Sequence, residues 1–400
     1  MDVTWVDLAS GSAMLALLGW ALVLFQIWRT VVSMRRLPGF APPAETGTYP
    51  TYSVSAVVAG GLDARALDRT VRSLLAQEGI RLQIVVVTRG EDDPCDEAMH
   101  ELAAQDSRIL VLRNPKLPVG WIEKNYALEL GQGRAEGDFI LFTEPGVFHG
   151  RRAIYNAMRC MDEEQLDHLA VHPRLEAGSF WEALILPLYV LIWEFRFVPH
   201  AAARPESGVG AGVSAFNLVR AETYRLRGTH ARIRNAILED RDLARMMRED
   251  GGRGSVMRAV TQLRTRPYRS FDELYAGIRC GTLVSAQDSA WTAFVMGAIL
   301  VMGGMLPPFL VLAGLVLAWS GGGPLCLVLA LTTVSLPVLG LLRARTMVRF
   351  EPIAALFFPL GAFLIGLSTM QAALGFALQG RLEWQGRSYQ RDELQAPRED

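Results

Sequence analysis

Four long apolar segments without charged side chains constrain the fold of this chain. The first is Leu8 to Trp28, and the others are Trp291 to Trp319, Leu325 to Leu342 and Pro352 to Leu378. Each is long enough to cross the hydrocarbon core of a bilayer as a helix. The hydrophobic half of the 400 residues is thus concentrated in segments, which predicts a multi-pass membrane protein.

The charges around the first apolar run indicate its orientation. Asp2 and Asp7 precede it, whereas Arg29, Arg35 and Arg36 follow it. A cleaved signal peptide carries its basic residues before the apolar core. Because basic flanks stay in the cytoplasm, we expect residues 1–36 to be an anchor and the next domain to be cytoplasmic.

The side of the membrane on which the chain ends depends on how many runs cross completely. Four full spans leave the polar tail, residues 381–400, outside, whereas a cytoplasmic tail requires one re-entrant run. The candidates for such a run are the break expected at Pro307 and Pro308 and the region of Pro359 and Gly361.

A soluble α/β pattern occupies residues 51–280, between a linker at 37–50 and the C-terminal membrane region at 289–380. The predicted strands are Ser53–Val58, Ile84–Val87, Ile109–Leu112 and Phe139–Thr143, and the predicted helices between them are Asp63–Gln77, Asp93–Asp106 and Gly120–Leu130. This alternation predicts a mostly parallel sheet with helices on both faces. Ligands of such sheets bind beyond the carboxyl ends of the strands.

The apolar segment at residues 180–198 differs from the four runs because it contains charges. Glu182, Glu194 and Arg196 would have to be buried in a spanning helix. We therefore expect a helix that lies in the membrane interface.

Composition excludes several classes of protein. The net charge of −1 gives no general attraction for nucleic acid. The four cysteines stand far apart without metal or redox spacing, which favours reduced thiols. Only two of the 40 basic residues are lysines, Lys116 and Lys124, a bias typical of a high-GC bacterial genome. We expect a bacterial inner-membrane protein.

Asp240 is the candidate for a catalytic base. It follows Glu239 in the segment Ile237-Leu-Glu-Asp-Arg-Asp-Leu, at the start of a predicted amphipathic helix that ends at Gly251 and Gly252. A carboxylate there can take a proton from a hydroxyl group. The alternative is that acidic residues in a first turn complement the helix dipole.

Two further segments bring charged residues to the expected ligand edge. A Pro/Gly turn delivers Trp121 and Lys124 to a helix start, where a lysine can meet a phosphate or simply be solvated. Glu144 follows the fourth strand, although Pro145-Gly146 also reads as a plain turn.

The remaining candidates carry weaker signals. The segment from Gly208 to Asn217, which includes Gly210, supplies small residues that allow a ligand to approach the backbone. His230 is a candidate contact for an acceptor, or a surface polar residue.

Taken in order, these segments resemble family 2 glycosyltransferases of the membrane-bound, lipid-modifying branch, with hopanoid-associated, carotenoid-associated and ceramide-type glucosyltransferases. The matching segments are Leu117-Pro-Val-Gly-Trp-Ile-Glu-Lys-Asn-Tyr-Ala, Phe142 to Val147, Gly208 to Arg220, Ile233 to Ala244, Arg264-Thr-Arg-Pro-Tyr-Arg and Trp384-Gln-Gly-Arg-Ser-Tyr. The likeness covers nearly the whole chain.

The resemblance implies a GT-A fold and inverting transfer from a nucleotide sugar, with a UDP-sugar expected first, to a membrane lipid. It implies the following roles: Asp240 as the base; Asp93, Lys124, Glu144, Arg264 and Arg266 at the donor; Trp121, Gly210, Glu239 and His230 at the acceptor; and Glu144 as a ligand of Mg²⁺ or Mn²⁺.

The departures from the family pattern concern the donor site. The first strand ends in Ala59-Gly-Gly rather than an Asn-Glu pair, and the second ends in Thr88-Arg89 rather than paired aspartates, of which only Asp93 survives. The metal element has become Glu144-Pro-Gly, and one glutamate is a poor cage for Mg²⁺ unless donor phosphates and water complete the shell. Arg89 is a candidate substitute for the lost metal charge.

Two other function classes are a binding protein without catalytic activity and a transporter. The eroded donor positions also fit a catalytically silent relative that serves as a binding or assembly partner in a membrane complex. Transport fits poorly, because the apolar runs after residue 290 contain no acid or base, which transporters usually need.

Overall fold

The structure is a computed structural model, and it describes residues 5–40, 52–61, 63–90, 93–114, 116–196, 202, 210–285, 289–321, 324–384 and 387–390. The chain forms two compact units. The globular unit comprises Ser33–Leu175, Pro199–Pro267 and Asp392–Asp400, and the helical unit comprises Met1–Val32, Glu176–Val198 and Tyr268–Arg391.

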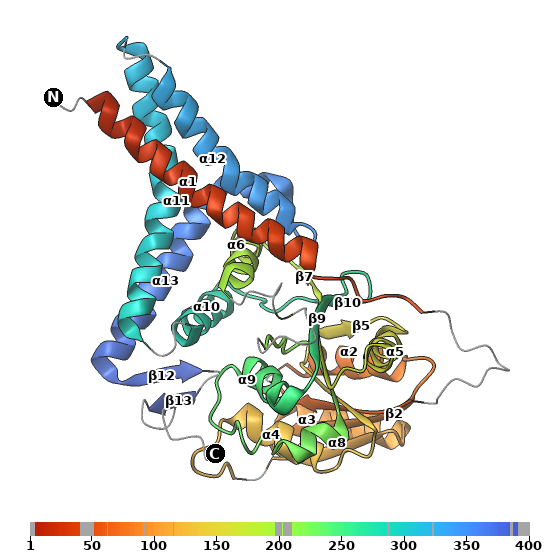
Figure 1. The fold of residues 1–400 in the computed structure, drawn as a ribbon. Coiled ribbons are helices and arrows are strands. Elements are labelled where there is room, and N and C mark those ends of the chain that lie inside the picture. The colour runs from red at the N-terminus through yellow and green to blue at the C-terminus, as the bar shows by residue number, and fades with distance from the viewer. Residues whose placement is uncertain are drawn as a thin grey trace. The chain divides into compact units, whose positions relative to one another are not determined.

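A seven-stranded sheet forms the centre of the globular unit (Figure 1). Its strands, in the order β3-β2-β1-β4-β8-β6-β9, are Ile109–Arg113, Arg81–Thr88, Ser53–Ala59, Phe139–Thr143, Asn217–Arg220, His168–His172 and Gly254–Arg258. Neighbouring strands are parallel except at β8, which runs antiparallel to both β4 and β6. The predicted mostly parallel sheet is confirmed.

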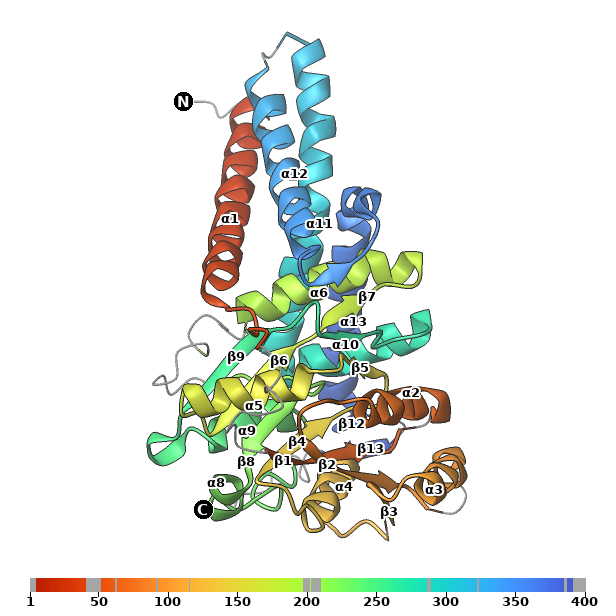
Figure 2. The same ribbon diagram turned by 90° about the vertical axis from the view of Figure 1, so that its right-hand side faces the viewer.

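Helices cover both faces of this sheet because its strands alternate their apolar side chains (Figure 2). On β1, Val54, Ala56 and Val58 join one core cluster with α2, α3 and α5, whereas Val57 joins another with α4, α8 and α9. The helices are α2 Ala64–Leu75, α3 Pro94–Gln105, α4 Glu123–Gln132, α5 Ala153–Glu163, α8 Ala221–Leu226 and α9 Glu239–Met246, with a 3-10 turn, η1, at Glu249–Gly251.

A second, smaller sheet begins with β5, the strand that follows β4 in the chain. Within the globular unit it consists of β7 (Arg174–Glu176), β10 (Leu263–Thr265) and β5 (Val147–His149), with β10 parallel to β7 and antiparallel to β5. The α/β pattern predicted only the four strands up to Thr143, so these short strands and β6, β8 and β9 of the large sheet are additions.

Among the residues that the structure describes, the helical unit contains four helices long and apolar enough to cross a membrane. The spans are Asp7–Gln26, Ala290–Trp319, Leu325–Ala344 and Pro352–Gln379. The elements of the unit are α1 Trp5–Ser33, α6 Phe180–Arg196, α10 Phe271–Ser285, α11 Ala290–Trp319, α12 Leu325–Ala344, β11 Val348–Arg349, η2 Pro352–Phe357, α13 Phe358–Gln379, β12 Arg381–Trp384 and β13 Arg387–Gln390. The start of the predicted polar tail thus forms a hairpin, and residues 391–400 lie outside the described part, as does most of the predicted linker.

The break expected at Pro307 and Pro308 is wrong, because α11 runs through both prolines. A proline leaves the carbonyl four residues earlier without its helical donor. For Pro307 that carbonyl belongs to Gly303, and it accepts a hydrogen bond of 3.2 Å from the indole N–H of Trp20 in α1. A neighbouring helix therefore satisfies the group that the proline frees.

The predicted interfacial helix is α6, and its first charged residue is accommodated locally. Glu182 is buried, and the hydroxyl of Ser179 donates to its Oε1 at 2.7 Å. Glu182 Oε2 accepts from the backbone N–H of Gly178 at 2.9 Å. The side chains of Glu194 and Arg196 lie outside the described part.

Candidate functional site

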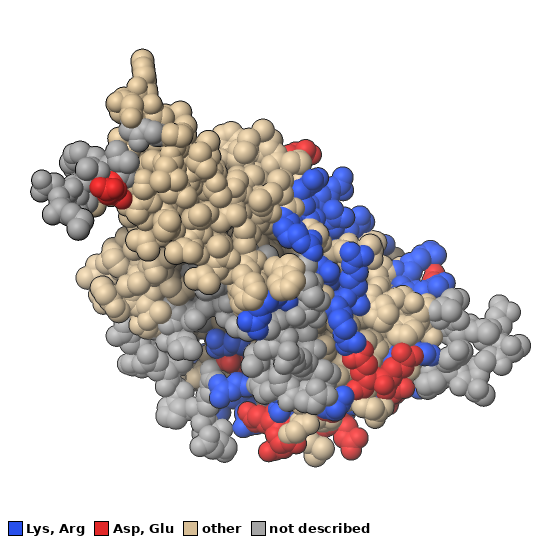
Figure 3. Space-filling view, turned by 45° about the horizontal axis from the view of Figure 1, so that its top comes forward, with Lys and Arg blue, Asp and Glu red and all other residues tan. Residues whose placement is uncertain are grey.

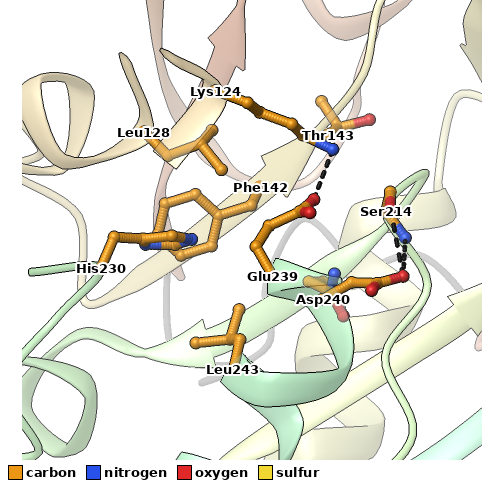
Figure 4. Close-up of a pocket in the computed structure, with 10 residues that line it drawn as sticks. Lys124, Leu128, Phe142, Thr143, Ser214, His230, Glu239, Asp240 and Leu243 are labelled. Carbon is orange, nitrogen blue, oxygen red and sulfur yellow. Dashed lines mark hydrogen bonds and ion pairs between the residues drawn. The ribbon is translucent and has the colours of Figure 1, made fainter. Parts of the chain in front are cut away.

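Three element ends in the globular unit converge on one small cavity (Figure 4). They are the carboxyl end of β4 and the first turns of α4 and α9. The cavity has room for about one water molecule. Its lining consists of Lys124, Leu128, Phe142, Thr143, Ser214, Asn217, His230, Glu239, Asp240 and Leu243. A strand end and two helix starts are where the α/β pattern predicted a ligand.

Lys124 is the central charge of this site. Its ammonium forms ion pairs with the carboxylates of both Glu144 and Glu239. The Lys124 and Glu239 side chains are only 12% and 8% exposed, whereas Glu144 is 37% exposed. Burial alone would lower the pKa of Lys124, but the two carboxylates raise it above its usual value, so the ammonium stays charged.

Glu239 is the least solvated member of this ion-pair triad. Burial raises its pKa to about 7, and the nearby Asp240 and Glu144 carboxylates add to the rise, while Lys124 partly opposes it. A carboxyl group with such a pKa exchanges its proton near neutral pH. The site therefore combines a permanent cation with a carboxylate that titrates.

Asn125 fixes the distance between the two helix starts. Its buried side-chain amide donates to the carbonyls of Ile233, Arg234 and Ala236 at 3.0, 3.2 and 2.8 Å. The carbonyl of Arg234 also accepts from the backbone N–H of Ile122 at 2.9 Å. The loop that leads into α9 is thereby tied to the start of α4, which holds Glu239 against Lys124.

Asp240 lies at the same cavity, held by a serine on the glycine-rich segment. Asp240 Oδ2 accepts from the backbone N–H and the hydroxyl of Ser214, each at 3.1 Å (Figure 4). Its Oδ1 accepts from the backbone N–H of Arg241 at 2.8 Å. These three donors hold the carboxylate in a fixed position at the cavity.

The glycines of this segment allow it to approach α9 closely. A Cβ atom on Gly212 would lie 1.9 Å from the carbonyl oxygen of Asp240, and one on Gly210 would lie 2.6 Å from the backbone nitrogen of Arg245. The small residues at these positions therefore allow the segment to pack directly against α9, the helix that carries Asp240. A role of Gly210 in binding an acceptor stays a prediction.

His230 lines the cavity as a buried, neutral side chain. The Tyr224 hydroxyl lies 2.5 Å from His230 Nδ1 and accepts from the His230 backbone N–H at 2.9 Å. His230 Nε2 has no partner among the described atoms. Burial and the charge of Lys124 lower the pKa of His230 to about 3. The surface alternative for His230 is therefore wrong.

The turn after β4 has the wrong donor set for a divalent cation. The Glu144 carboxylate is already paired with Lys124, and Gly146 adopts a positive φ of 92° and offers no side chain. Its backbone N–H donates to the Thr70 hydroxyl at 2.9 Å, which fixes the turn on α2. In the described part of the chain, no three His, Cys, Asp or Glu side chains form a group that could hold a metal. The residues at this turn do not fit Mg²⁺ or Mn²⁺.

The other predicted donor and acceptor residues lie outside the lining of this cavity. Asp93 is the N-cap of α3, where it accepts from the backbone N–H of Cys95. Trp121 packs on Tyr126 with ring centroids 5.2 Å apart. The Arg264 guanidinium lies 4.2 Å from the centre of the Phe148 ring. Arg266 comes directly after β10 in the chain. Binding roles for these residues stay predictions.

A second ion pair lies beside the triad. Arg89, directly after β2, contacts Glu123 with 3.1 Å between Nε and Oε1. Glu123 precedes Lys124 in the first turn of α4. Arg89, which stands where the resemblance leads one to expect aspartates, is therefore paired with a residue of the recognised lysine segment.

Sequence reasoning missed three residues that position the site. Asn125 directly follows Lys124 in the recognised segment, and the sequence pattern assigns no contact to its side chain. Ser214 lies inside the glycine-rich segment, where a hydroxyl among small residues was a usable signal. Tyr224 could not be connected with His230, because nothing in the pattern indicates that their side chains meet.

Comparison with known proteins agrees with this fold. Residues 62–204 match the sequence profile of glycosyl transferase family 2. The mannosyltransferase PcManGT from Pyrobaculum calidifontis, solved in complex with GDP-Man and Mn²⁺, is similar over 94% of this chain and 99% of its own, with 16% identity and a TM-score of 0.51. S. aureus TarS 1-349 in complex with UDP-GlcNAc is 13% identical over 84% of this chain and 96% of its own, with a TM-score of 0.41. No curated protein matches the chain. The predicted fold class, a GT-A-like sheet with apolar helices near both termini, is confirmed.

Proposed function

We propose that this chain is a glycosyltransferase that moves a sugar from a nucleotide-sugar donor to a membrane lipid, with inversion at the anomeric carbon. The match of residues 62–204 to glycosyl transferase family 2 supports the reaction class. The observation that carries the proposal is the position of Asp240, whose carboxylate lines the same cavity as Lys124 at the carboxyl end of β4.

The proposed chemistry is a single displacement. The acceptor hydroxyl oxygen attacks the anomeric carbon, the bond from that carbon to the diphosphate oxygen breaks, and its electron pair leaves with the diphosphate. Asp240 takes the hydroxyl proton, for which Ser214 and the backbone N–H of Arg241 hold its carboxylate in place. Lys124 faces the developing negative charge of the leaving group.

The cavity is too small to hold a nucleotide sugar, so it corresponds to the deep end of the site. Asp93, Arg264 and Arg266 are proposed to meet the donor farther out, and Trp121, Gly210, Glu239 and His230 the acceptor. The Nε2 atom of His230, which has no partner among the described atoms, supports this assignment, because a buried polar nitrogen without a partner is costly unless a ligand group pairs with it.

The set of apolar helices supports a lipid acceptor. Four helices in the described part of the chain could cross a membrane. Within the helical unit, α6 packs on α13, where Gly361 allows close contact with Leu184 and Leu188. We propose a bacterial inner-membrane protein with residues 51–280 in the cytoplasm and a UDP-sugar as donor. Mannosyl or other GDP-linked donors are the next candidates, since PcManGT binds GDP-Man.

The test of the base compares Asp240→Asn with Asp250→Asn in the full chain. Asp250 is a suitable control because its side chain is 95% exposed on η1, away from the cavity. Membranes that contain each variant receive radiolabelled nucleotide sugars, and the extracted lipids are separated. We expect Asp240→Asn to lose transfer by about 10²–10⁴-fold while the control keeps it. Unchanged transfer by Asp240→Asn would refute this assignment.

A catalytically silent relative is the second candidate. This candidate is favoured because Lys124 and Arg89, the two cations at the expected donor site, are both already paired with carboxylates. Titration of the purified chain with UDP- and GDP-sugars separates the two candidates. Saturable binding supports the transferase, whereas no binding of any donor supports the silent relative.

A further inference from the structure

We infer that the donor site works with a lysine ammonium in place of a divalent cation: Lys124, held between Glu144 and Glu239, supplies the positive charge that the leaving diphosphate requires. The inference rests on the proposed function and names the cation of that same site. It reverses the expectation of Mg²⁺ or Mn²⁺ that the family resemblance implied.

The first support is the placement of the ammonium. Lys124 stands in the first turn of α4, whose N-cap residue Ile122 makes no side-chain capping bond. A helix start and a buried cation together attract an anion. The carboxylates of Glu144 and Glu239 aim the ammonium at the end of β4.

The second support is that the ammonium occupies the place where a metal would need its ligands. Glu144 is the sole acidic residue from Phe139 to His149, and its carboxylate pairs with Lys124. The other position of the metal element is Gly146, whose positive φ of 92° few side chains adopt. A divalent ion on Glu144 would stand beside a like charge that burial keeps from being screened.

The third support is independent of the triad. Arg89 brings a second cation to the end of β2, where the resemblance places aspartates, and it is paired with Glu123 at 3.1 Å. Two consecutive residues of α4, Glu123 and Lys124, therefore complete two ion pairs at neighbouring strand ends. Two cations, Arg89 and Lys124, therefore stand at the donor edge, where they can meet a diphosphate that arrives without a metal.

In the transfer step the ammonium performs one task. When the bond between the anomeric carbon and the phosphate oxygen breaks, the oxygen gains the electron pair, and Lys124 donates a charge-assisted hydrogen bond to it. Glu144, which is more exposed than Glu239, is the partner that Lys124 releases as the diphosphate arrives. No proton has to leave Lys124.

The experiment measures donor binding by the purified full chain, with a panel of UDP- and GDP-sugars, in excess EDTA and in Mn²⁺. We expect equal affinity in both conditions. We expect Lys124→Met to bind about 10- to 100-fold more weakly, because a charge-assisted hydrogen bond is lost. Lys116→Met is the matched control, since Lys116 is the other lysine of the chain and is exposed. The double variant Lys124→Met/Glu239→Gln, which leaves no unpaired buried carboxylate, covers the case in which Lys124→Met fails to fold.

The outcomes separate this inference from the proposed function. Metal-independent binding that requires Lys124 supports both. Binding that EDTA abolishes and Mn²⁺ restores overturns the inference and leaves the proposed function standing, as does metal-free binding that Lys124→Met leaves unchanged. No binding of any donor in either condition overturns both.

Discussion

Replacing Glu239 by glutamine measures what it costs the fold to bury this carboxylate beside Lys124. Burial raises the pKa of Glu239 to about 7 from an ordinary 4.5. The folded chain therefore holds a proton that the unfolded chain releases between these two pH values. Stability from this group is fully present below pH 4.5 and falls as the pH rises toward 7.

The magnitude follows from the two pKa values. Each unit of difference corresponds to about 1.4 kcal/mol, and the part that falls between pH 5 and pH 8 is on the order of 2–3 kcal/mol. Glutamine does not titrate, and Lys124 keeps its charge throughout this range because its pKa is raised. The wild-type chain should therefore lose on the order of 2–3 kcal/mol relative to Glu239→Gln between pH 5 and pH 8.

Thermal unfolding of the full chain in detergent, followed across this pH range, checks the prediction. For a domain of this size the difference in Tm between the two proteins should change by roughly 5–10 °C. Glu222→Gln is the control, because Glu222 is exposed at the start of α8, and its profile should run parallel to that of the wild type. Parallel profiles for Glu239→Gln as well would show that the carboxylate is not held at a raised pKa.

Two further substitutions test how the site is positioned. Asn125→Ala removes the donor to three buried carbonyls and should destabilise the globular unit by about 2–4 kcal/mol, read as a Tm lower by roughly 5–15 °C; an unchanged Tm would show that the loop before α9 does not depend on this side chain. Gly212→Ala places a Cβ atom 1.9 Å from the Asp240 carbonyl oxygen. This substitution should destabilise the unit by about 1–3 kcal/mol and reduce sugar transfer. Gly39→Ala is the control, because nothing lies within 4 Å of its new Cβ atom, and it should change neither the stability nor the transfer. Wild-type activity and Tm in Gly212→Ala would mean that α9 moves freely.

The periodic part of the fold was predictable from the sequence. The four parallel strands and the helices between them follow from apolar runs bounded by turn residues, and each predicted strand overlaps an observed one. The antiparallel β8 was not predictable in the same way, because the direction of a strand depends on partners about 50 to 80 residues away. Helix starts were less reliable: the helix expected from Gly120 begins at Glu123.

The site was predictable as a set of residues but not as a set of contacts. Asp240 and Lys124 stood out through motif likeness and position. Their shared cavity and the pairing of Lys124 with Glu239, 115 residues later, depend on how Asn125 ties two loops together, which no local pattern records. The continuity of α11 through Pro307 was likewise hidden, because the group that repairs it is Trp20 on a distant helix.

The pairing of the first helix with the last ones sets an order for biosynthesis. Trp20 and the carbonyl of Ala13 meet Gly303 and Thr333, partners that are 283 and 320 residues away along the chain. At roughly 5–20 residues per second, α1 waits on the order of a quarter of a minute to a minute after its own synthesis before Thr333 is made. Two segments of the globular unit, Ser33–Leu175 and Pro199–Pro267, are synthesised before these partners exist. They can therefore begin to fold while α1 is still without its contacts to α11 and α12.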